Sequence, residues 1–217
     1  MTALTISRFT SRIAVPARTN VTWAQLVNLL SDPCRTPCSL ENCAGSACHH
    51  KDGGCWSPAT FRPSSKYRSA KDVEAISCLV LDIDHVPSPA VDAMIDHLAR
   101  YQHLLHSTHA DRSDDRSLRV VVQLSRSVMP GEWSRFWPAA VNSLCAPADP
   151  VCGDVARLYY YPSCPRDADY FVAHGDGEAL DVDALLEVPA RVCAHQLFDA
   201  SCHVGGPEAP NQEGKVS

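Results

Sequence analysis

Residues 76–85 read ISCLVLDIDH, and this stretch decides the fold. Its first six residues carry no charge, which is typical of a strand in the middle of a sheet with both faces buried. Side chains that alternate along a strand point to the same face. Asp82 and Asp84 are therefore expected side by side at the end of this strand.

Capping signals and apolar spacing place the other elements around this strand. Thr22 starts a helix, and Gln25, three residues on, completes a capping box. Pro138 is expected to kink or divide a helix over residues 133–144. The remaining elements are expected as strands at residues 4–9, 103–107, 118–124, 158–161 and 170–172, and as helices at 88–98 and 181–186.

This order predicts an α/β (α+β) fold with a mixed or largely antiparallel sheet. The chain has 217 residues, of which 45% are apolar, enough for one compact domain with a core. We place that domain at residues 1–202, with a cysteine-rich insertion at 33–56. Residues 203–217 are poor in apolar side chains and are expected to be a disordered tail.

The net charge of −6 argues at first against a nucleic-acid binder. Residues 174–217 carry that whole net charge, however, and the rest of the chain is neutral. No stretch approaches about 18 uninterrupted apolar residues, and the N-terminus lacks the apolar core of a signal peptide. We therefore expect no membrane association and a cytoplasmic location. A basic run with Arg62, Lys66 and Arg68 is either a solvated loop or a surface that faces phosphates.

Eleven cysteines are many for a chain of this length. Without a signal peptide a disulfide scaffold is the weaker explanation, so metal binding competes with simple burial. The early cysteines and a histidine among them have the ligand types of a tetrahedral zinc site, the alternative being reduced loop thiols. These candidate ligands are Cys34, Cys38, Cys43, Cys48, His49 and Cys55.

Asp82 and Asp84 are the strongest candidates for chemistry. Two carboxylates on one face repel each other unless a cation lies between them, and oxygen ligands suit Mg²⁺ or Mn²⁺. The alternative is a solvated acidic turn. Further candidates follow later strands: Ser107, His109, Arg116, Arg119 and Arg157 as phosphate ligands, and Asp149 or Asp154 as a third metal carboxylate.

Residues 50–186 resemble the archaeo-eukaryotic primase superfamily, in particular the primases and primase-polymerases of phages and plasmids. LVLDIDH at residues 79–85 is similar to the first motif of that family, and Ser107-Thr108-His109 to its Ser-x-His motif. The stretch from Asp149 to Arg157 and the tyrosines after it is similar to the third motif and its following strand. The sequence differs from many members of the family in two ways: it contains the cysteine-rich insertion, and it contains no helicase part.

The resemblance implies a catalytic sheet like that of an RNA-recognition motif, packed beside a smaller N-terminal α/β unit. It implies template-directed nucleotidyl transfer with two Mg²⁺ or Mn²⁺ ions held by Asp82, Asp84 and Asp149 or Asp154. His109, Ser107 and Arg119 would hold the nucleoside triphosphate. The implied partners are single-stranded DNA and a separate replicative helicase, in the bacterial host of a mobile element.

Two other classes of function stay open. LVLDIDHV also resembles the nucleophile strand of haloacid-dehalogenase-like phosphohydrolases, with Asp82 as nucleophile and Asp84 as acid and base. That family needs a downstream lysine, and after Lys71 the sequence has only Lys215. The other class is a non-catalytic, zinc-containing replication initiator that only recognises DNA.

Overall fold

The computed structural model describes residues 3–144 and 146–188. Its centre is a five-stranded sheet with the order β11-β7-β8-β6-β5, in which all neighbours are antiparallel. The expected tail at 203–217 lies outside the described residues. Within the described part, no helix has the length and hydropathy that crossing a membrane requires.

The central sheet has the β-α-β-β-α-β order that the resemblance implies. Its strand β8 is inserted between β6 and β7, while β11 and β5 pair with the two outer edges. The α+β fold prediction is therefore confirmed. The successive elements are β6 (Val73–Val86), α2 (Ser88–Leu98), β7 (Gln102–Ser107), β8 (Arg116–Val128), α3 (Pro130–Ser143) and β11 (Val172–Asp176), with β5 (Ala59–Phe61) before them.

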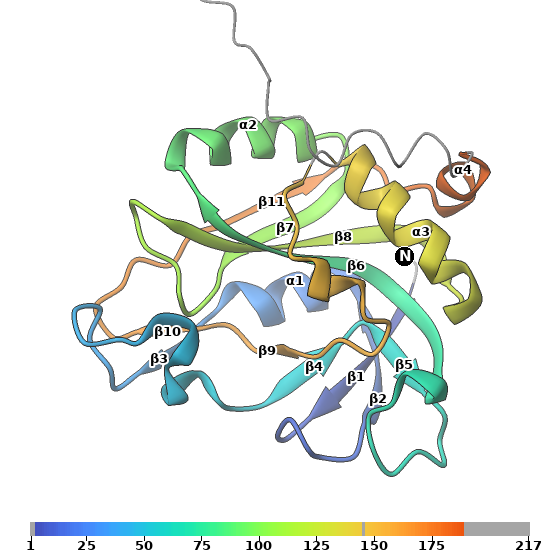
Figure 1. Ribbon diagram of the computed structural model, residues 1–217, viewed down its shortest axis with the longest axis horizontal. Helices are drawn as coiled ribbons and strands as arrows, with labels where there is room; N and C mark the ends of the chain where they lie inside the picture. Colours follow the sequence, from blue (N-terminus) through green and yellow to red (C-terminus); the bar gives the residue numbers. More distant parts are fainter. Residues whose placement is uncertain (1–2, 145, 189–217) are drawn as a thin grey trace, which may run out of the picture.

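A smaller sheet with the order β2-β1-β4-β9 forms the N-terminal unit, which lies below the central sheet in Figure 1. The predicted capping box is present at the start of its helix, where Thr22 and Gln25 bond reciprocally. The last strand comes from much later in the chain. The elements are β1 (Ala3–Phe9), β2 (Ala17–Thr22), α1 (Trp23–Ser31), β4 (Cys55–Ser57) and β9 (Tyr159–Tyr160).

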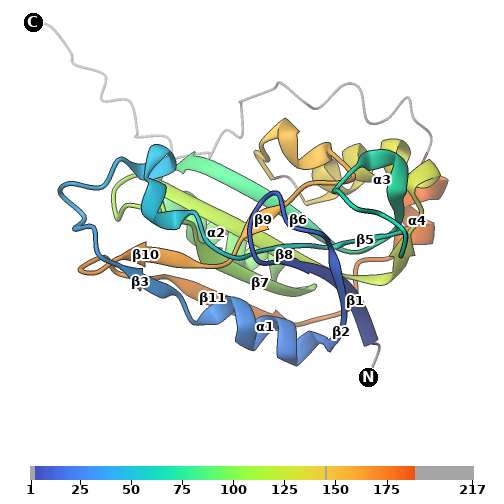
Figure 2. The ribbon, with the colours of Figure 1, turned by 90° about the horizontal axis from the view of Figure 1, so that it is seen from below.

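The cysteine-rich segment lies at one end of the molecule, beside a late strand (Figure 2). There β3 (Cys34–Thr36) pairs in parallel with β10 (Ser163–Pro165). Two 3₁₀ turns, η1 (Gly45–Ala47) and η2 (His49–Lys51), follow within the segment. Later in the chain come η3 (Ala70–Asp72), η4 (Pro150–Gly153) and α4 (Val182–Glu187), the last capped by Asp181 as expected.

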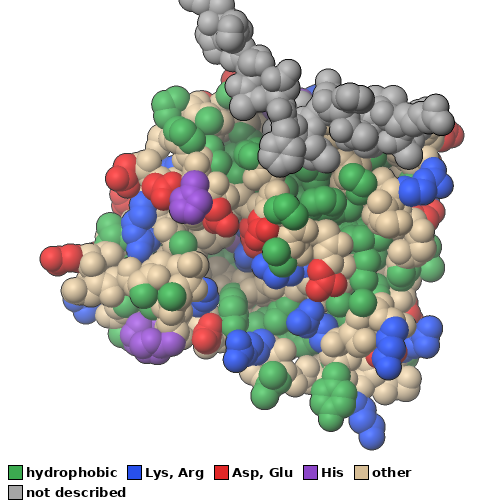
Figure 3. All heavy atoms as spheres, viewed as in Figure 1, with side chains coloured by type: hydrophobic (Ala, Val, Ile, Leu, Met, Phe, Trp, Pro, Cys, Tyr) green, Lys and Arg blue, Asp and Glu red, His purple; other side chains and the backbone are tan. Residues whose placement is uncertain are grey.

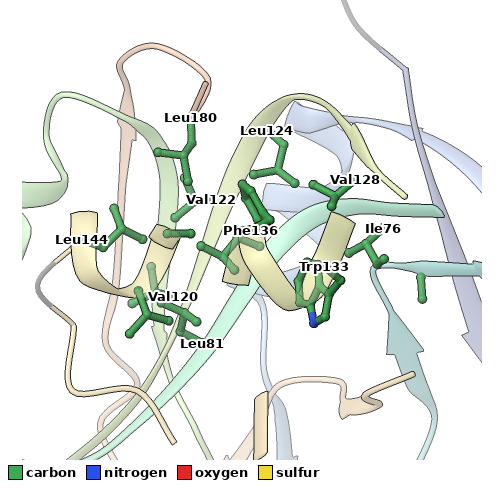
Figure 4. Packing of buried hydrophobic residues seen from close by; sticks show 14 of the residues in the cluster. Ile76, Leu81, Val120, Val122, Leu124, Val128, Trp133, Phe136, Leu144 and Leu180 are labelled. Carbon is green, nitrogen blue, oxygen red and sulfur yellow. The ribbon is translucent and has the colours of Figure 1, made fainter. Parts of the chain in front are cut away.

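The central strands bury both faces, which explains their continuous apolar sequence. On one face Leu81, Val120 and Val122 belong to a cluster of buried residues that includes Trp133 and Phe136 of α3 (Figure 4). The other face packs against the N-terminal unit through a second cluster that contains Cys78, Val80, Leu104, Val121, Leu26 and Trp56. The two sheets are thus held together across an apolar layer, and the polar ends of the strands extend beyond it.

The structure defines the limits of two expected elements. Pro138 lies inside α3, and of the two expected outcomes, a kink or a division, the helix is not divided. A proline inside a helix costs about 3 kcal/mol, and burial of Trp133, Phe136 and Ala140 on the same helix offsets that cost. The strand expected to end in residues 82–85 runs from Val73 to Val86, so both aspartates lie within β6, near its end.

Candidate active site

A cavity of about 450 Å³ opens where the polar ends of the central strands meet the loop after α3. The face seen in Figure 3 is hollowed near its centre, and acidic and basic side chains gather there. Sequence-predicted residues that line the cavity are Asp82, Asp84, Ser107, His109, Arg119, Asp149, Asp154, Arg157 and Arg68. Residues from five separate parts of the chain therefore meet in one place.

Asp82, Arg119 and His106 form a row across three strands. Asp82 on β6 is directly opposite Arg119 on β8, and Arg119 is opposite His106 on β7. Directly opposed residues of antiparallel strands place their side chains on the same face. All three line the cavity. The register of the sheet thus fixes an acid, a guanidinium group and an imidazole side by side.

Arg119 is bound to the Asp82 carboxylate instead of being free for a ligand. Its Nε donates to Oδ1 at 2.6 Å and its Nη2 to Oδ2 at 3.2 Å. The guanidinium group also donates to the Tyr160 carbonyl and lies over the Tyr159 ring. Burial lowers the pKa of Arg119, but the Asp82 carboxylate outweighs it, so the pKa is raised and the side chain stays charged.

The other acids reach the same cavity from different directions. Asp84 is exposed at its mouth. The Asp149 backbone N–H donates to the Asp82 carbonyl at 2.8 Å, which ties the third-motif loop to the end of β6. The Asp154 carboxylate lies 3.9 Å from the Arg68 guanidinium and accepts from the Ala156 N–H. Of the two candidates for a third acid, Asp149 is the one joined directly to β6.

Ser107, which lines the cavity, and Arg116 are joined by a network of hydrogen bonds around Asp111. The Ser107 hydroxyl donates to the Asp111 carboxylate and accepts from the Phe171 N–H. Arg116 makes two bonds of 2.9 Å to the same carboxylate and does not line the cavity. These contacts hold the turn between β7 and β8, so Ser107 and Arg116 lie in positions suited to shaping the cavity.

His109 lies at the boundary between the cavity and the cysteine-rich segment. Its Nε2 is 3.4 Å from the Cys43 sulfur and 3.7 Å from the Cys38 sulfur, and Cys48 completes a group of four. The structure therefore brings three of the predicted zinc ligands together, with His109 in place of His49. Cys34 is exposed on β3, Cys55 is buried on β4, and His49 stacks on His50 instead.

Sequence reasoning missed two cavity residues, His106 and Lys51, as functional candidates. Nothing in the sequence showed which face of β7 points into the cavity. Burial lowers the pKa of His106 to about 4, so the ring is neutral at physiological pH. Its Nε2 has no partner among the described residues, and the same holds for Nε of Arg157.

The basic run before β6 is divided between the cavity and the surface. Arg68 points inward, and its guanidinium group donates to the Ala156 carbonyl. Arg62 and Lys66 are exposed outside the cavity. Tyr67, between Lys66 and Arg68, is 73% exposed. The run thus offers an exposed aromatic ring and two exposed cationic side chains.

Comparison with known proteins gives a family for this arrangement. The model of the VapE N-terminal domain matches residues 2–190. The chain belongs to this family. No curated protein matches the chain. Among solved structures, this VapE N-terminal domain is similar to the AEP domain of the cyanophage S-2L primase-polymerase, with 12% identity, 85% of this chain and 89% of that chain covered, and a TM-score of 0.46.

Proposed function

We propose that the cavity binds a nucleoside triphosphate and catalyses template-directed nucleotidyl transfer, as in a primase or primase-polymerase. The observation that carries the proposal is the placement of Asp82 and Asp84 on the central strand at the wall of a cavity that also contains cationic side chains. Acids that hold metal and bases that hold phosphate are the two sets of groups that phosphoryl transfer needs.

The acidic residues fit divalent metal ions. Asp82 is only 9% exposed, so its charge needs a cation nearby, and Arg119 supplies one in the chain alone. Asp84 and Asp149 offer further carboxylate oxygens at the same cavity, the ligand type that Mg²⁺ and Mn²⁺ prefer. Two such ions at these acids would activate the attacking 3′-hydroxyl and neutralise charge on the phosphates.

The residues of the chain then have distinct tasks. Arg157, whose Nε has no partner in the described part of the chain, and Lys51 line the cavity and would hold phosphate oxygens. Arg119 acts through Asp82, whose carboxylate it keeps in one orientation. Asp111 holds Ser107 and Arg116 and so keeps the adjoining turn in place. Correct placement of charged groups provides most of the rate enhancement in this class of reaction.

The template would cross the surface beside the cavity. Arg62 and Lys66 lie outside it on the exposed basic run, with Tyr67 beside them. Cationic side chains bind the backbone of single-stranded DNA without reading its sequence, and an exposed aromatic ring stacks on its bases. A helicase acting as a separate protein would supply single-stranded template for this reaction.

The phosphohydrolase alternative receives no support from the site. It requires Asp82 as a nucleophile, but both carboxylate oxygens accept hydrogen bonds from Arg119. Charge-assisted hydrogen bonds to both oxygens stabilise the negative charge of the carboxylate and so make it a weaker nucleophile. Hydrolysis of a phosphate monoester without any DNA would nevertheless revive this alternative.

The test is synthesis or extension of primers on single-stranded DNA with Mg²⁺ or Mn²⁺. We expect activity in the natural chain and its loss in the double variant Asp82→Ala plus Asp84→Ala. A matched control is Asp92→Ala plus Asp96→Ala, which removes two exposed acids from α2. Retained synthesis in the first double variant, or its loss in both, would refute the assignment. A natural chain that binds DNA and never synthesises would favour the non-catalytic initiator.

A further inference from the structure

Four potential metal ligands come together where the cysteine-rich segment covers the end of β7. The three sulfur atoms of Cys38, Cys43 and Cys48 and Nε2 of His109 all lie within 4.8 Å of one another. The three cysteines come from one loop. His109 comes just after β7 and is 61 to 71 positions away from the cysteines in the sequence. Among the described residues no other group of three or more such ligands forms.

The separations between these atoms match the edges of a zinc tetrahedron. Bonds of about 2.3 Å to sulfur and about 2.0 Å to nitrogen put neighbouring ligand atoms roughly 3.5–3.8 Å apart. The observed separations are 3.4 Å and 3.7 Å from Nε2 to two sulfurs and 3.9 Å between the Cys38 and Cys48 sulfurs. All three cysteines are free thiols, so no disulfide accounts for the cluster.

The second ring nitrogen of His109 is held as in a metal-bound histidine. Nδ1 lies 3.0 Å from the Ser163 hydroxyl on β10, to which it donates when Nε2 carries no proton. Such a hydrogen bond fixes the tautomer and the ring orientation of a histidine ligand. The Arg112 side chain near Cys43 lowers the pKa of that thiol, and its positive charge would offset part of the net negative charge of three thiolates and one divalent ion.

We propose that Cys38, Cys43, Cys48 and His109 bind one Zn²⁺ ion, and that this ion joins the cysteine-rich segment to the wall of the cavity. Thiolate and imidazole ligands select zinc over Mg²⁺ or Mn²⁺. With four protein ligands the site is closed, which is the arrangement of structural zinc and leaves no position for a substrate. His109 of the Ser-x-His motif is then a zinc ligand and not a ligand of the nucleotide.

The zinc ion would also place Lys51 at the cavity. Lys51 follows Cys48 by three residues in η2 and lines the cavity together with Ser46 of η1. The segment between Thr36 and Cys55 contains only these two 3₁₀ turns, so few backbone bonds hold it in place. Anchoring at Cys43 and Cys48 orders both turns at once. This second part rests on the proposed function, whereas zinc binding itself does not.

The first experiment measures zinc and its ligands in the full natural chain. We expect one zinc ion per chain by elemental analysis, with three sulfur neighbours and one nitrogen neighbour by X-ray absorption at the zinc edge. Because this measurement needs no variant, misfolding cannot obscure it. A natural chain that holds no zinc after purification and takes up none on titration with zinc chloride would overturn the proposal, whatever its activity.

Matched variants then identify the ligands. Cys43→Ser and His109→Ala should each lose most of the zinc, whereas Cys34→Ser and His49→Ala, in the same segment or beside it, should keep it. Circular dichroism shows which variants still fold. If His109→Ala folds and retains zinc at the level of the natural chain, His109 is not a ligand and the proposal is wrong.

The last measurement separates the zinc site from the proposed reaction. Removing zinc with a chelator should weaken binding of a nucleoside triphosphate by at least about tenfold, the scale of disturbing a supporting contact, and adding zinc chloride back should restore it. If the chain binds one zinc ion but removal of the zinc leaves nucleotide binding unchanged, the proposed link between the zinc site and the cavity is refuted. Absence of nucleotide binding in every sample would instead count against the proposed function.

Discussion

The Arg119 guanidinium group and the Asp82 carboxylate form a two-bond ion pair across the two central strands, with donor–acceptor distances of 2.6 Å and 3.2 Å. Both side chains are only 12% exposed. A pair of this kind is costly to bury and even more costly to break, because the remaining charge has no partner. The proposed metal site thus already contains an internal cation that neutralises its central acid.

Arg119→Met should therefore destabilise the fold by about 3–5 kcal/mol, because Asp82 is left as an unpaired buried charge. Urea unfolding measures this change. The double variant Arg119→Met plus Asp82→Asn should recover part of the loss. If metal ions bind at Asp82, saturating Mn²⁺ should stabilise Arg119→Met more than the natural chain. An equal effect of Mn²⁺ on both would show that the ion binds elsewhere.

Asp149 and Asp154 should differ in their importance for catalysis. Asp149→Asn should lower the rate of nucleotidyl transfer by roughly 100-fold or more, the scale seen when one electrostatic group is removed from a site. Asp154→Asn should have a smaller effect, because its carboxylate already lies beside the Arg68 guanidinium group. Single-turnover primer extension compares them. A larger loss in Asp154→Asn would make Asp154 the third acid.

The exposed basic run should bind single-stranded DNA through two separable effects. Arg62→Ala and Lys66→Ala should each weaken binding and lower the slope of log affinity against log salt by about 0.7, as expected for one lost phosphate contact. Tyr67→Ala should cost about 1–3 kcal/mol through lost base stacking and leave that slope unchanged. Fluorescence anisotropy over a salt series measures both. Unchanged affinity in all three variants would place the template on another surface.

His106 should make stability depend on pH in the mildly acidic range. The unfolded chain takes up a proton at this residue near its ordinary pKa of 6.5, whereas burial lowers the pKa in the fold to about 4. Between these values the unfolded state binds more protons, so stability decreases as the pH falls. This one residue changes the free energy of unfolding by at most about 1.4 kcal/mol per pH unit.

The variant His106→Asn should remove that contribution, which flattens the curve of unfolding free energy against pH between about 6.5 and 4. His174→Asn, which changes an exposed histidine on β11, is the matched control and should leave the curve as it is. Zinc loss at low pH affects all three proteins alike, so the difference between them is informative. Identical curves for the natural chain and His106→Asn would contradict the prediction.

The sequence by itself determined the features that depend on neighbouring residues. The alternation of Asp82 and Asp84 put both on one face of a strand, because a strand repeats every two residues. The caps at Thr22 and Asp181 followed from side chains that reach backbone N–H groups two or three residues away. Uninterrupted apolar runs predicted central strands that are buried on both faces. The two core clusters, one on each face of the sheet, agree with this prediction.

Only the tertiary structure decided which distant groups meet. The register of β6, β8 and β7 gave Asp82 its partner Arg119 and brought His106 into the same row. A slip of any one of these strands by one residue would have turned its member of the row to the other face. His109 met Cys38, Cys43 and Cys48 instead of His49 because a loop with little regular structure folds back over β7. Such contacts depend on chain paths between segments tens of residues apart, which local sequence patterns do not encode.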